Sequence, residues 1–311
     1  FAIYPLSIAL FRTADVSRKL IPATITLGAF TFTMTALPGT PQIQNIIPTE
    51  YFQTTPTAGP IMVVVAGLIM AVGGYLYLAW RGKSLQSKGE GFTEPKNGNE
   101  VKDIDVSTLP NPYLSILPLI LVVLVLNVLK LDILPSLLIG ILSIMIISFK
   151  KFKMFIGSIN GGAAGSAMAI LNTSAAVGFG AVVTAVPSFK QLTDLILGIK
   201  GNPLISEAVA VQLLASITGS ASGGMGIALE ALGSKYYELS QTTGISPEAF
   251  HRIASVASGA SILPHNGALL TLLAVTGLKH RDSYLDVAVV GFIIPTIAVI
   301  AAIILASLGI Y

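Results

Sequence analysis

Long apolar stretches separated by short polar turns dominate the chain. The continuous ones lie at residues 58–80, 112–129, 133–149, 155–187 and 284–309. A helix needs about 20 predominantly apolar residues to cross the hydrocarbon core of a bilayer, so stretches of this length are typical of spanning helices. The pattern predicts an all-α polytopic membrane protein with about six full crossings and additional partial ones.

Two further apolar stretches are interrupted near their middle by a Leu-Pro pair. Residues 35–42 read Thr-Ala-Leu-Pro-Gly-Thr-Pro-Gln, and residues 261–268 read Ser-Ile-Leu-Pro-His-Asn-Gly-Ala. Proline inside a helix removes a hydrogen bond and clashes with the preceding turn. We therefore expect discontinuous helices here, the second one within 251–277. The helix-breaking residues are Pro38, Pro41, Pro264 and Gly267.

A third interruption lies in the weaker apolar stretch 203–235. The Gly- and Ser-rich residues 218–224 divide this stretch into two parts, each too short to span a bilayer. The sequence therefore predicts a re-entrant hairpin whose tip lies at these residues.

Basic residues in the short loops indicate the orientation, because cytoplasmic loops carry an excess of Lys and Arg. The four clusters are Arg12, Arg18 and Lys19; Arg81, Lys83 and Lys88; Lys150, Lys151 and Lys153; and Lys279 with Arg281. One topology places all four in the cytoplasm and the C-terminus outside. In that topology the two broken helices run in opposite directions, as in transporters built from inverted repeats.

The interruptions divide the chain into two repeats and a linker. Residues 1–80 are expected to be the C-terminal part of a first repeat, comprising a hairpin return arm, a broken helix and a scaffold span. Residues 81–111 are a hydrophilic cytoplasmic linker, and 112–311 form a second repeat with scaffold spans, hairpin, broken helix and final span. Because Phe1 already lies in an apolar stretch, we expect the first repeat to be truncated at its N-terminus.

Composition narrows the class of protein. The 311 residues are 53% hydrophobic and only 11% charged, whereas soluble domains carry roughly 25% charged residues. This excludes a soluble enzyme, a nucleic-acid-binding protein and a disordered chain. With no cysteine, no metal-spaced His/Glu set and no phosphate-binding loop, no metal or other cofactor is expected.

The interruptions also carry the candidate binding chemistry. Irregular backbone at membrane depth is tolerated where it is buried in protein or lines a wet cavity, and half-helix N-termini attract anions. The polar and small residues at these positions, which would bind a small organic anion, are Gly39, Thr40, Gln42, Asn45, Ser220, Ala221, Ser222 and Asn266. A proline kink with internally bonded hydroxyls is the alternative at each break.

His265 is the candidate for proton coupling. It is the one histidine expected within the membrane, and histidine titrates near neutral pH. A neutral imidazole bonded to a carbonyl freed by Pro264 is the alternative. Glu207, Glu230 and Asp194 are expected at interfaces, with Glu207 and Glu230 as the next candidates for the proton. Arg252 is expected to anchor a helix end.

Four segments together resemble the gluconate permease (GntP-type) family. They are Ala-Leu-Pro-Gly-Thr-Pro-Gln-Ile-Gln-Asn at 36–45, Asn-Thr-Ser-Ala-Ala-Val-Gly-Phe-Gly-Ala-Val-Val at 172–183, Gly-Ser-Ala-Ser-Gly-Gly at 219–224 and Leu-Pro-His-Asn-Gly-Ala at 263–268. The resemblance covers the chain as the C-terminal two-thirds of a member. Within the wider ion transporter superfamily it implies two inverted repeats, an elevator-type carrier and a homodimer.

The resemblance implies proton-coupled uptake of gluconate or a related sugar acid, without enzymatic activity. Other hydroxy- or short-chain carboxylates, such as 3-hydroxybutyrate, lactate or citrate, are the close alternatives, and sodium is the alternative coupling ion. Sodium-coupled dicarboxylate carriers show Ser-Asn-Thr where this chain has Ser220-Ala221-Ser222, which favours protons. A channel is a remote alternative, since it would not need inverted repeats. An intramembrane hydrolase is also remote, since no orienting carboxylate lies near a Ser/His pair in the sequence.

Overall fold

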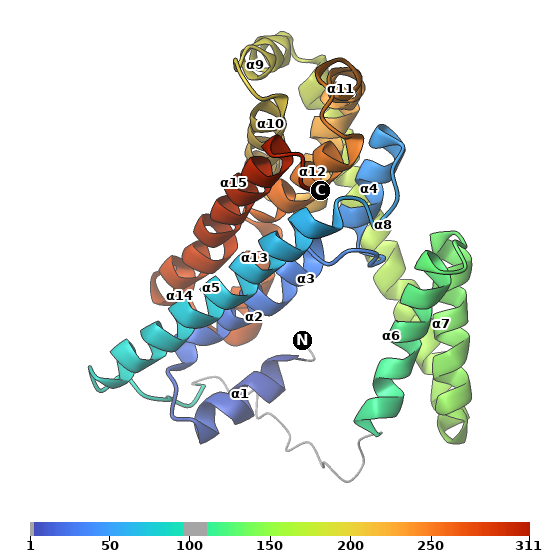
Figure 1. Ribbon diagram of the computed structural model, residues 1–311. Helices are drawn as coiled ribbons and strands as arrows, with labels where there is room; N and C mark the ends of the chain where they lie inside the picture. Colours follow the sequence, from blue (N-terminus) through green and yellow to red (C-terminus); the bar gives the residue numbers. More distant parts are fainter. Residues whose placement is uncertain (1–2, 96–110) are drawn as a thin grey trace.

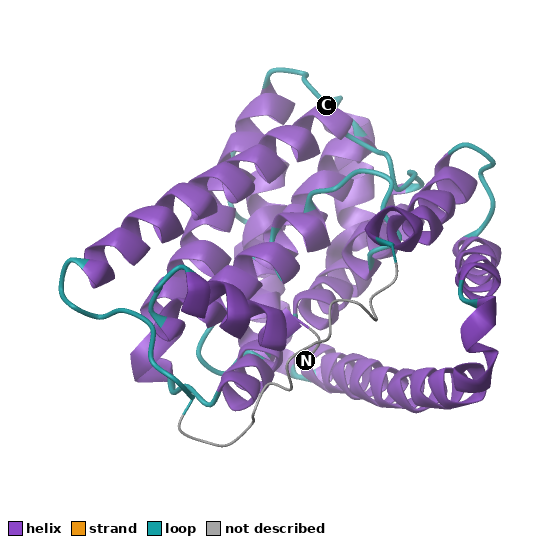
Figure 2. Cartoon of the chain, turned by 90° about the horizontal axis from the view of Figure 1, so that it is seen from below, coloured by secondary structure: helices purple, strands orange, loops and turns teal. Residues whose placement is uncertain are grey.

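The computed structural model describes residues 3–95 and 111–311, and these residues form helices and loops with no strand among them (Figures 1 and 2). Before the linker lie α1 (Ile3–Thr13), η1 (Arg18–Leu20), α2 (Ile21–Ala29), α3 (Phe32–Thr35), α4 (Ile43–Phe52) and α5 (Pro60–Gln86). After it come α6 (Pro112–Asn127), α7 (Ile133–Ile147), η3 (Phe149–Met154), α8 (Phe155–Ala185) and α9 (Pro187–Leu197). The last part comprises α10 (Pro203–Thr218), α11 (Ala221–Thr243), α12 (Pro247–Gly259), α13 (Gly267–Thr276), α14 (His280–Ala288), η4 (Val289–Ile293) and α15 (Ile294–Ser307).

The all-α membrane fold predicted from the sequence is confirmed. Two runs of helix in the described chain, Pro60–Gln86 and His280–Ser307, are long and apolar enough to cross a membrane. A third candidate, Ile133–Ile147 with Phe149–Ala167, is bent by 110° at its break. This is fewer than the six crossings expected, in part because α6 and α7 have only 16 and 15 residues and the turn between them takes up the rest of the apolar stretch.

The long helices α5 and α15 pack along each other in opposite directions (Figure 1). At one end the amide of Ile61 bonds to the carbonyl of Tyr311, at 3.3 Å. At the other end Arg81 Nε and Tyr77 Oη both donate to Asp286 Oδ1, at 2.8 and 2.7 Å. Each of these long helices follows one of the two broken helices in the chain, so their antiparallel arrangement is the one that inverted repeats require.

The broken helices also cross each other. Both interruptions lie where they were predicted: α3 and α4 are separated by residues 36–42, and α12 and α13 by residues 260–266. The crossing is close because Gly259 has no side chain, and a Cβ there would lie 2.8 Å from Thr35 Cγ2. Ser255 Oγ adds a 2.9 Å bond to the carbonyl of Thr35. The last turns before the two breaks are therefore packed together.

Helices α10 and α11 form the helical hairpin predicted at 203–235, and its second arm continues to Thr243. Gly219 ends the first arm with φ = 65°, a conformation that favours glycine. Ser220 begins the second arm, and its Oγ accepts a bond from the amide of Gly223, at 3.1 Å. At Gly224 the arms touch backbone to backbone, since a Cβ there would lie 2.1 Å from Ala215 Cα.

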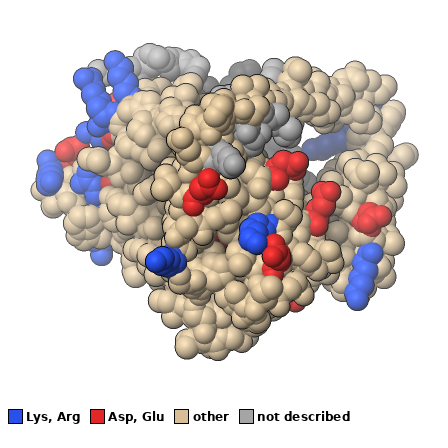
Figure 3. Space-filling model, turned by 90° about the horizontal axis from the view of Figure 1, so that it is seen from above, with Lys and Arg blue, Asp and Glu red and all other residues tan. Residues whose placement is uncertain are grey.

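Basic residues gather at the end of the molecule where α5 ends. Ion pairs join Arg12 to Glu94, Lys19 to Glu90 and Arg81 to Asp286. Helix η1 also packs against α14, which follows Lys279. Figure 3 shows basic side chains clustered at this margin, next to a broad uncharged surface. Helix α5 continues six residues into the segment predicted as a linker, and residues 96–110 of that linker lie outside the described residues.

Replacing Gly224 with alanine tests the hairpin contact. The added methyl group would overlap the backbone of Ala215, so the arms must separate, and we expect a loss of about 1–3 kcal/mol in stability. Gly226→Ala is the matched control, because nothing lies within 4 Å of a Cβ at that position of the same helix. Thermal unfolding in detergent should show a lower midpoint for Gly224→Ala alone. Equal midpoints for the two variants would contradict the close contact.

Candidate functional site

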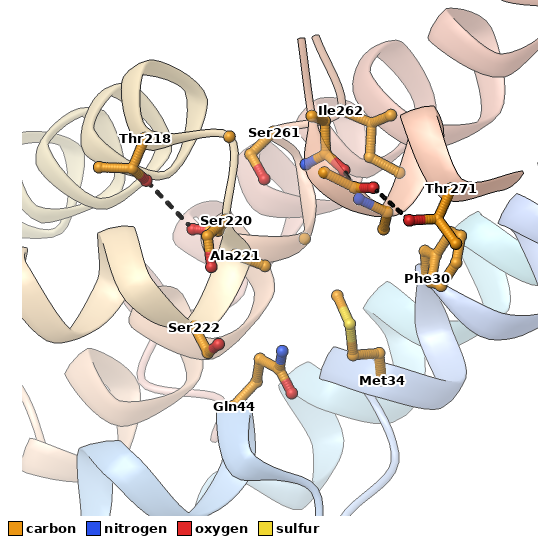
Figure 4. Close-up of a pocket in the computed structure, with 15 residues that line it drawn as sticks. Phe30, Met34, Gln44, Thr218, Ser220, Ala221, Ser222, Ser261, Ile262 and Thr271 are labelled. Atoms are coloured by element: carbon orange, nitrogen blue, oxygen red, sulfur yellow. Dashed lines mark hydrogen bonds between the residues drawn. The ribbon is translucent and has the colours of Figure 1, made fainter. Parts of the chain in front are cut away.

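A cavity of about 750 Å³ lies between the hairpin tip, the second break and the first broken helix (Figure 4). Three helices present their N-terminal residues to it. These are α4 through Gln44, α11 through Ser220, Ala221 and Ser222, and α13 through Asn266, Gly267 and Ala268. The remaining lining residues are Phe30, Met34, Thr218, Gly219, Gly259, Ser261, Ile262 and Thr271.

The N–H groups of α11 and α13 differ in what they can offer a ligand. At α13 the Asn266 side chain accepts from the amides of Ala268 and Leu269, and the amide of Gly267 bonds to the carbonyl of Gly219. At α11 the amides of Ala221 and Ser222 lie in the first turn, where the helix supplies no carbonyl four residues earlier. The N-terminus of α11 is therefore better able to hold an anion.

Gln44 is the most informative residue of the lining. Its side chain is 5% exposed, and its Oε1 has no hydrogen-bond partner among the described residues. Buried polar atoms without a partner are rare in folded proteins because each costs free energy. Figure 4 shows the amide of Gln44 directed into the cavity, near Ser222 and opposite Met34. The Nε2 group of this amide can donate a hydrogen bond to a polar ligand in the cavity.

The cavity owes its electrostatic character to helix ends. The residues that line it in the described chain include no Asp, Glu, Lys, Arg or His. The N-termini of α4 and α11 contribute partial positive charge, and the C-terminal ends of α10 and α12, at Thr218 and Gly259, contribute carbonyl oxygens. One side of the wall is apolar, formed by Phe30, Met34 and Ile262 (Figure 4).

The structure brings together only part of the predicted site. Ser220, Ala221, Ser222, Asn266 and Gly267 line the cavity. The residues predicted at the first break do not line it, and Gln42 is exposed. The absent residues are Pro38, Gly39, Thr40, Pro41, Gln42 and Asn45.

The first break is instead bound to the loop before α5 and to α6. The amide of Gly39 donates to the carbonyl of Pro56, at 2.8 Å, and Asn127 Nδ2 donates to the carbonyl of Gly39, at 2.7 Å. Thr40 Oγ1 bonds back to the carbonyl of Leu37. These contacts satisfy the backbone of the break within the protein.

Asn45 and Arg252 form the hydrogen bonds that connect the first broken helix to the loop before α5. Asn45 Nδ2 donates to the carbonyls of Thr40 and Pro56, at 2.8 and 3.0 Å. The guanidinium of Arg252, which is fully buried, donates to Asn45 Oδ1 and to the carbonyls of Ala58 and Pro56. Arg252 belongs to α12, so a residue of the second broken helix binds Asn45 of the first broken helix and the loop before α5, to which the first break is also bonded.

His265 lies behind the hairpin tip, outside the cavity lining. Its Nε2 is 2.9 Å from the carbonyl of Ser216 and must donate, because a carbonyl can only accept. The ring also packs on Gly219, where a Cβ would lie 3.2 Å from His265 Cδ2. The carbonyl of Pro264 accepts a bond from His280 Nε2, at 2.7 Å. The second break is therefore fixed to the end of α10 and to α14.

Sequence reasoning missed Gln44 and the role of Arg252. Gln44 lies in the quoted segment 36–45, but Gly39, Thr40, Gln42 and Asn45 were selected there instead. The signal for Arg252 was an arginine inside an otherwise apolar stretch, where a charged residue usually has a specific partner. Its partners are carbonyl oxygens and one amide, and these could not be identified from residue types.

A helical membrane fold with a polar cavity at the ends of interrupted helices has the features of a membrane transporter. Comparison with known proteins gives the same class. The chain is 40% identical to "Uncharacterized transporter YxjC" of Bacillus subtilis (strain 168), over 99% of this chain and 74% of that protein. The chain therefore belongs to the family of this transporter. No family model matches it, and no solved structure does.

Replacing Arg252 with methionine tests whether the hydrogen bonds of its guanidinium stabilise this part of the fold. The variant leaves the carbonyl of Ala58 and Asn45 Oδ1 without their guanidinium donor, at about 1–3 kcal/mol for each acceptor left buried and unpaired. Thermal unfolding should show a strongly lowered midpoint. Lys235→Met, which removes an exposed ion pair with Glu238, is the control and should cost less than about 1 kcal/mol. An Arg252→Met protein as stable as this control would show that these hydrogen bonds do not stabilise the fold.

Proposed function

We propose that the protein is a secondary active transporter that takes up gluconate or a related hydroxylated carboxylate together with protons. The observation that carries this proposal is the cavity at the N-termini of α4 and α11, whose described lining residues offer hydroxyl and amide groups and include no charged side chain. One carboxylate would bind at the first turn of α11, near Ser220 and Ser222. The substrate hydroxyls would bond to Gln44 and Asn266.

The lining favours a monocarboxylate over a citrate-like anion. Each further carboxylate buried in the cavity would need its own compensating charge or donors, because burying an unpaired charge is costly. The apolar wall of Phe30, Met34 and Ile262 supports a second candidate, a short-chain hydroxy acid such as 3-hydroxybutyrate or lactate, whose alkyl group would pack there.

The remaining parts of the proposal concern the setting. The chain would lie in a bacterial inner (plasma) membrane as a homodimer, with the basic end that includes Arg12, Lys19 and Arg81 in the cytoplasm and the C-terminus on the periplasmic side. The ion pairs that gather the basic clusters at one end support this orientation. A proton, with sodium as the alternative, would be the coupling ion.

Uptake by the full-length protein in proteoliposomes tests the function. The panel should include gluconate, 3-hydroxybutyrate, lactate and citrate, each with a pH gradient, with a sodium gradient and with neither. We expect accumulation of a hydroxylated monocarboxylate when the pH gradient is present. Accumulation driven by a sodium gradient alone would show that sodium, and not the proton, is the coupling ion. The absence of transport of every hydroxy acid in the panel would refute the proposal.

Ser222→Ala tests the carboxylate position. Loss of one neutral hydrogen bond costs about 0.5–1.5 kcal/mol, which corresponds to a KM raised roughly 2- to 12-fold for the transported acid. Ser143→Ala is the control, because this hydroxyl bonds to the carbonyl of Gly140 in α7, away from the cavity. If uptake by Ser222→Ala has the same KM as the control, Ser222 does not contact the substrate.

A further inference from the structure

Glu207, in the first arm of the hairpin, is a buried acid that the proposed substrate site does not use. Its side chain is 0% exposed, and neither carboxyl oxygen has a hydrogen-bond partner in the described chain. The sequence predicted this residue at an interface, and the structure places it in the packed interior of α10. Leu204 and Val211, which are one turn before and one turn after it, are also fully buried.

The elements packed against α10 supply no cation to Glu207 among the side chains that the structure describes. On α11, Tyr236 is the titratable group whose charge would influence it, and Tyr236 Oη is bonded to Ser206 Oγ, at 3.0 Å. On α12, His251 Nδ1 is bonded to Thr54, and Arg252 binds the loop before α5.

The other described titratable groups on these elements are exposed or bonded elsewhere, as Glu248 of α12 is to the amide of Gly59. Asp194 of α9 is exposed, and α15 contains no titratable residue. On the far side of α11, Lys235 pairs with Glu238 and Glu230 accepts from Tyr51 Oη.

Asp286 shows what a paired buried acid looks like in this protein. It is 3% exposed, and its Oδ1 accepts bonds from both Arg81 and Tyr77. Glu207 has the same degree of burial and none of these partners. An ionised carboxylate in such surroundings is strongly disfavoured, whereas a neutral carboxyl group is tolerated. Glu207 therefore holds a proton in the conformation described here.

Glu207 shares its helix with the substrate cavity. Helix α10 ends at Thr218, which lines the cavity, and its cap Gly219 contacts the second break. Eleven residues separate Glu207 from Thr218, about 16 Å along the axis of a helix. A movement of the tip on substrate release is thus carried by the same rigid element to the buried acid.

We propose that Glu207 is the residue that binds the coupled proton, retaining it while α10 is packed as described and releasing it when movement of the hairpin brings water to the carboxyl group. This rests on the proposed proton-coupled transport. The substrate at the tip and the proton on Glu207 occupy separate sites on one helix, so each raises the affinity for the other by the same factor.

The test uses the full-length transporter in proteoliposomes with Glu207→Gln, His265→Asn and Glu230→Gln. Two assays are needed: accumulation driven by a pH gradient, and exchange of labelled for unlabelled substrate without a gradient. Glu207→Gln should lose accumulation and keep exchange, because glutamine resembles the protonated acid. His265→Asn should keep accumulation, as should Glu230→Gln, whose carboxylate is exposed. If Glu207→Gln still accumulates substrate as the wild type does, the assignment is wrong.

The assays distinguish a failure of proton-coupled transport from a failure of the assignment of the proton to Glu207. If the wild type exchanges substrate but shows no accumulation driven by a pH gradient, proton coupling itself fails. If His265→Asn loses accumulation and Glu207→Gln retains it, the proton site moves to His265.

Infrared spectroscopy gives a second readout that does not depend on transport. The wild type should show a carbonyl stretching band from a protonated carboxyl group at neutral pH. Glu207→Asp, which keeps an acid if the glutamine variant fails to fold, should shift this band and retain coupling. A wild-type protein without the band would show that Glu207 is ionised and would overturn the proposal.

Discussion

A helix that stops inside an apolar protein leaves backbone groups without partners, and the structure depends on how these groups are satisfied. At the first break the amide of Gly39 binds the carbonyl of Pro56 and the carbonyl of Gly39 binds Asn127, and the loop that contains Pro56 and Ala58 binds the buried guanidinium of Arg252. At the second break the hairpin and α14 supply the partners. What remains is the first turn of α11, whose amides have no carbonyl within the helix and lie at a cavity. The binding site is thus a consequence of the interruptions.

The two breaks are related in sequence but are held differently. Contacts of the first come from α6 and the loop before α5, and Arg252 of α12 binds that loop and Asn45 of α4, as a charged group with three acceptors. The second is bound to the hairpin through the amide of Gly267, which donates to Gly219, and through His265 Nε2, which bonds to the carbonyls of Ser216 and Ile217. Charge-assisted bonds are the stronger kind. We therefore expect the first break to stay fixed while the hairpin and the second break separate during transport.

Much of this arrangement follows from the sequence. Leu-Pro pairs inside apolar stretches located both breaks, because proline cannot continue a helix, and the Gly- and Ser-rich tip located the hairpin. Residue types alone could not show which polar groups would satisfy each other. Asn45 was therefore assigned to the substrate although it binds Arg252, and Glu207 was placed at an interface although it is buried. Gln44 lies in the first turn of α4 and is buried at the cavity, whereas Gln42 caps the helix and is exposed. Residue type alone does not distinguish them.

The central claim is that the cavity at α11 binds a carboxylate, and site-directed labelling measures this directly. The 311-residue sequence contains no cysteine, so Ala221→Cys introduces one thiol into the cavity wall without removing a hydrogen-bonding side chain. The rate of maleimide labelling should fall when gluconate or 3-hydroxybutyrate is added, while labelling of Ser143→Cys in α7 should not change. Labelling of Ala221→Cys at the same rate with and without saturating hydroxy acid, in a protein that transports that acid, would contradict the claim.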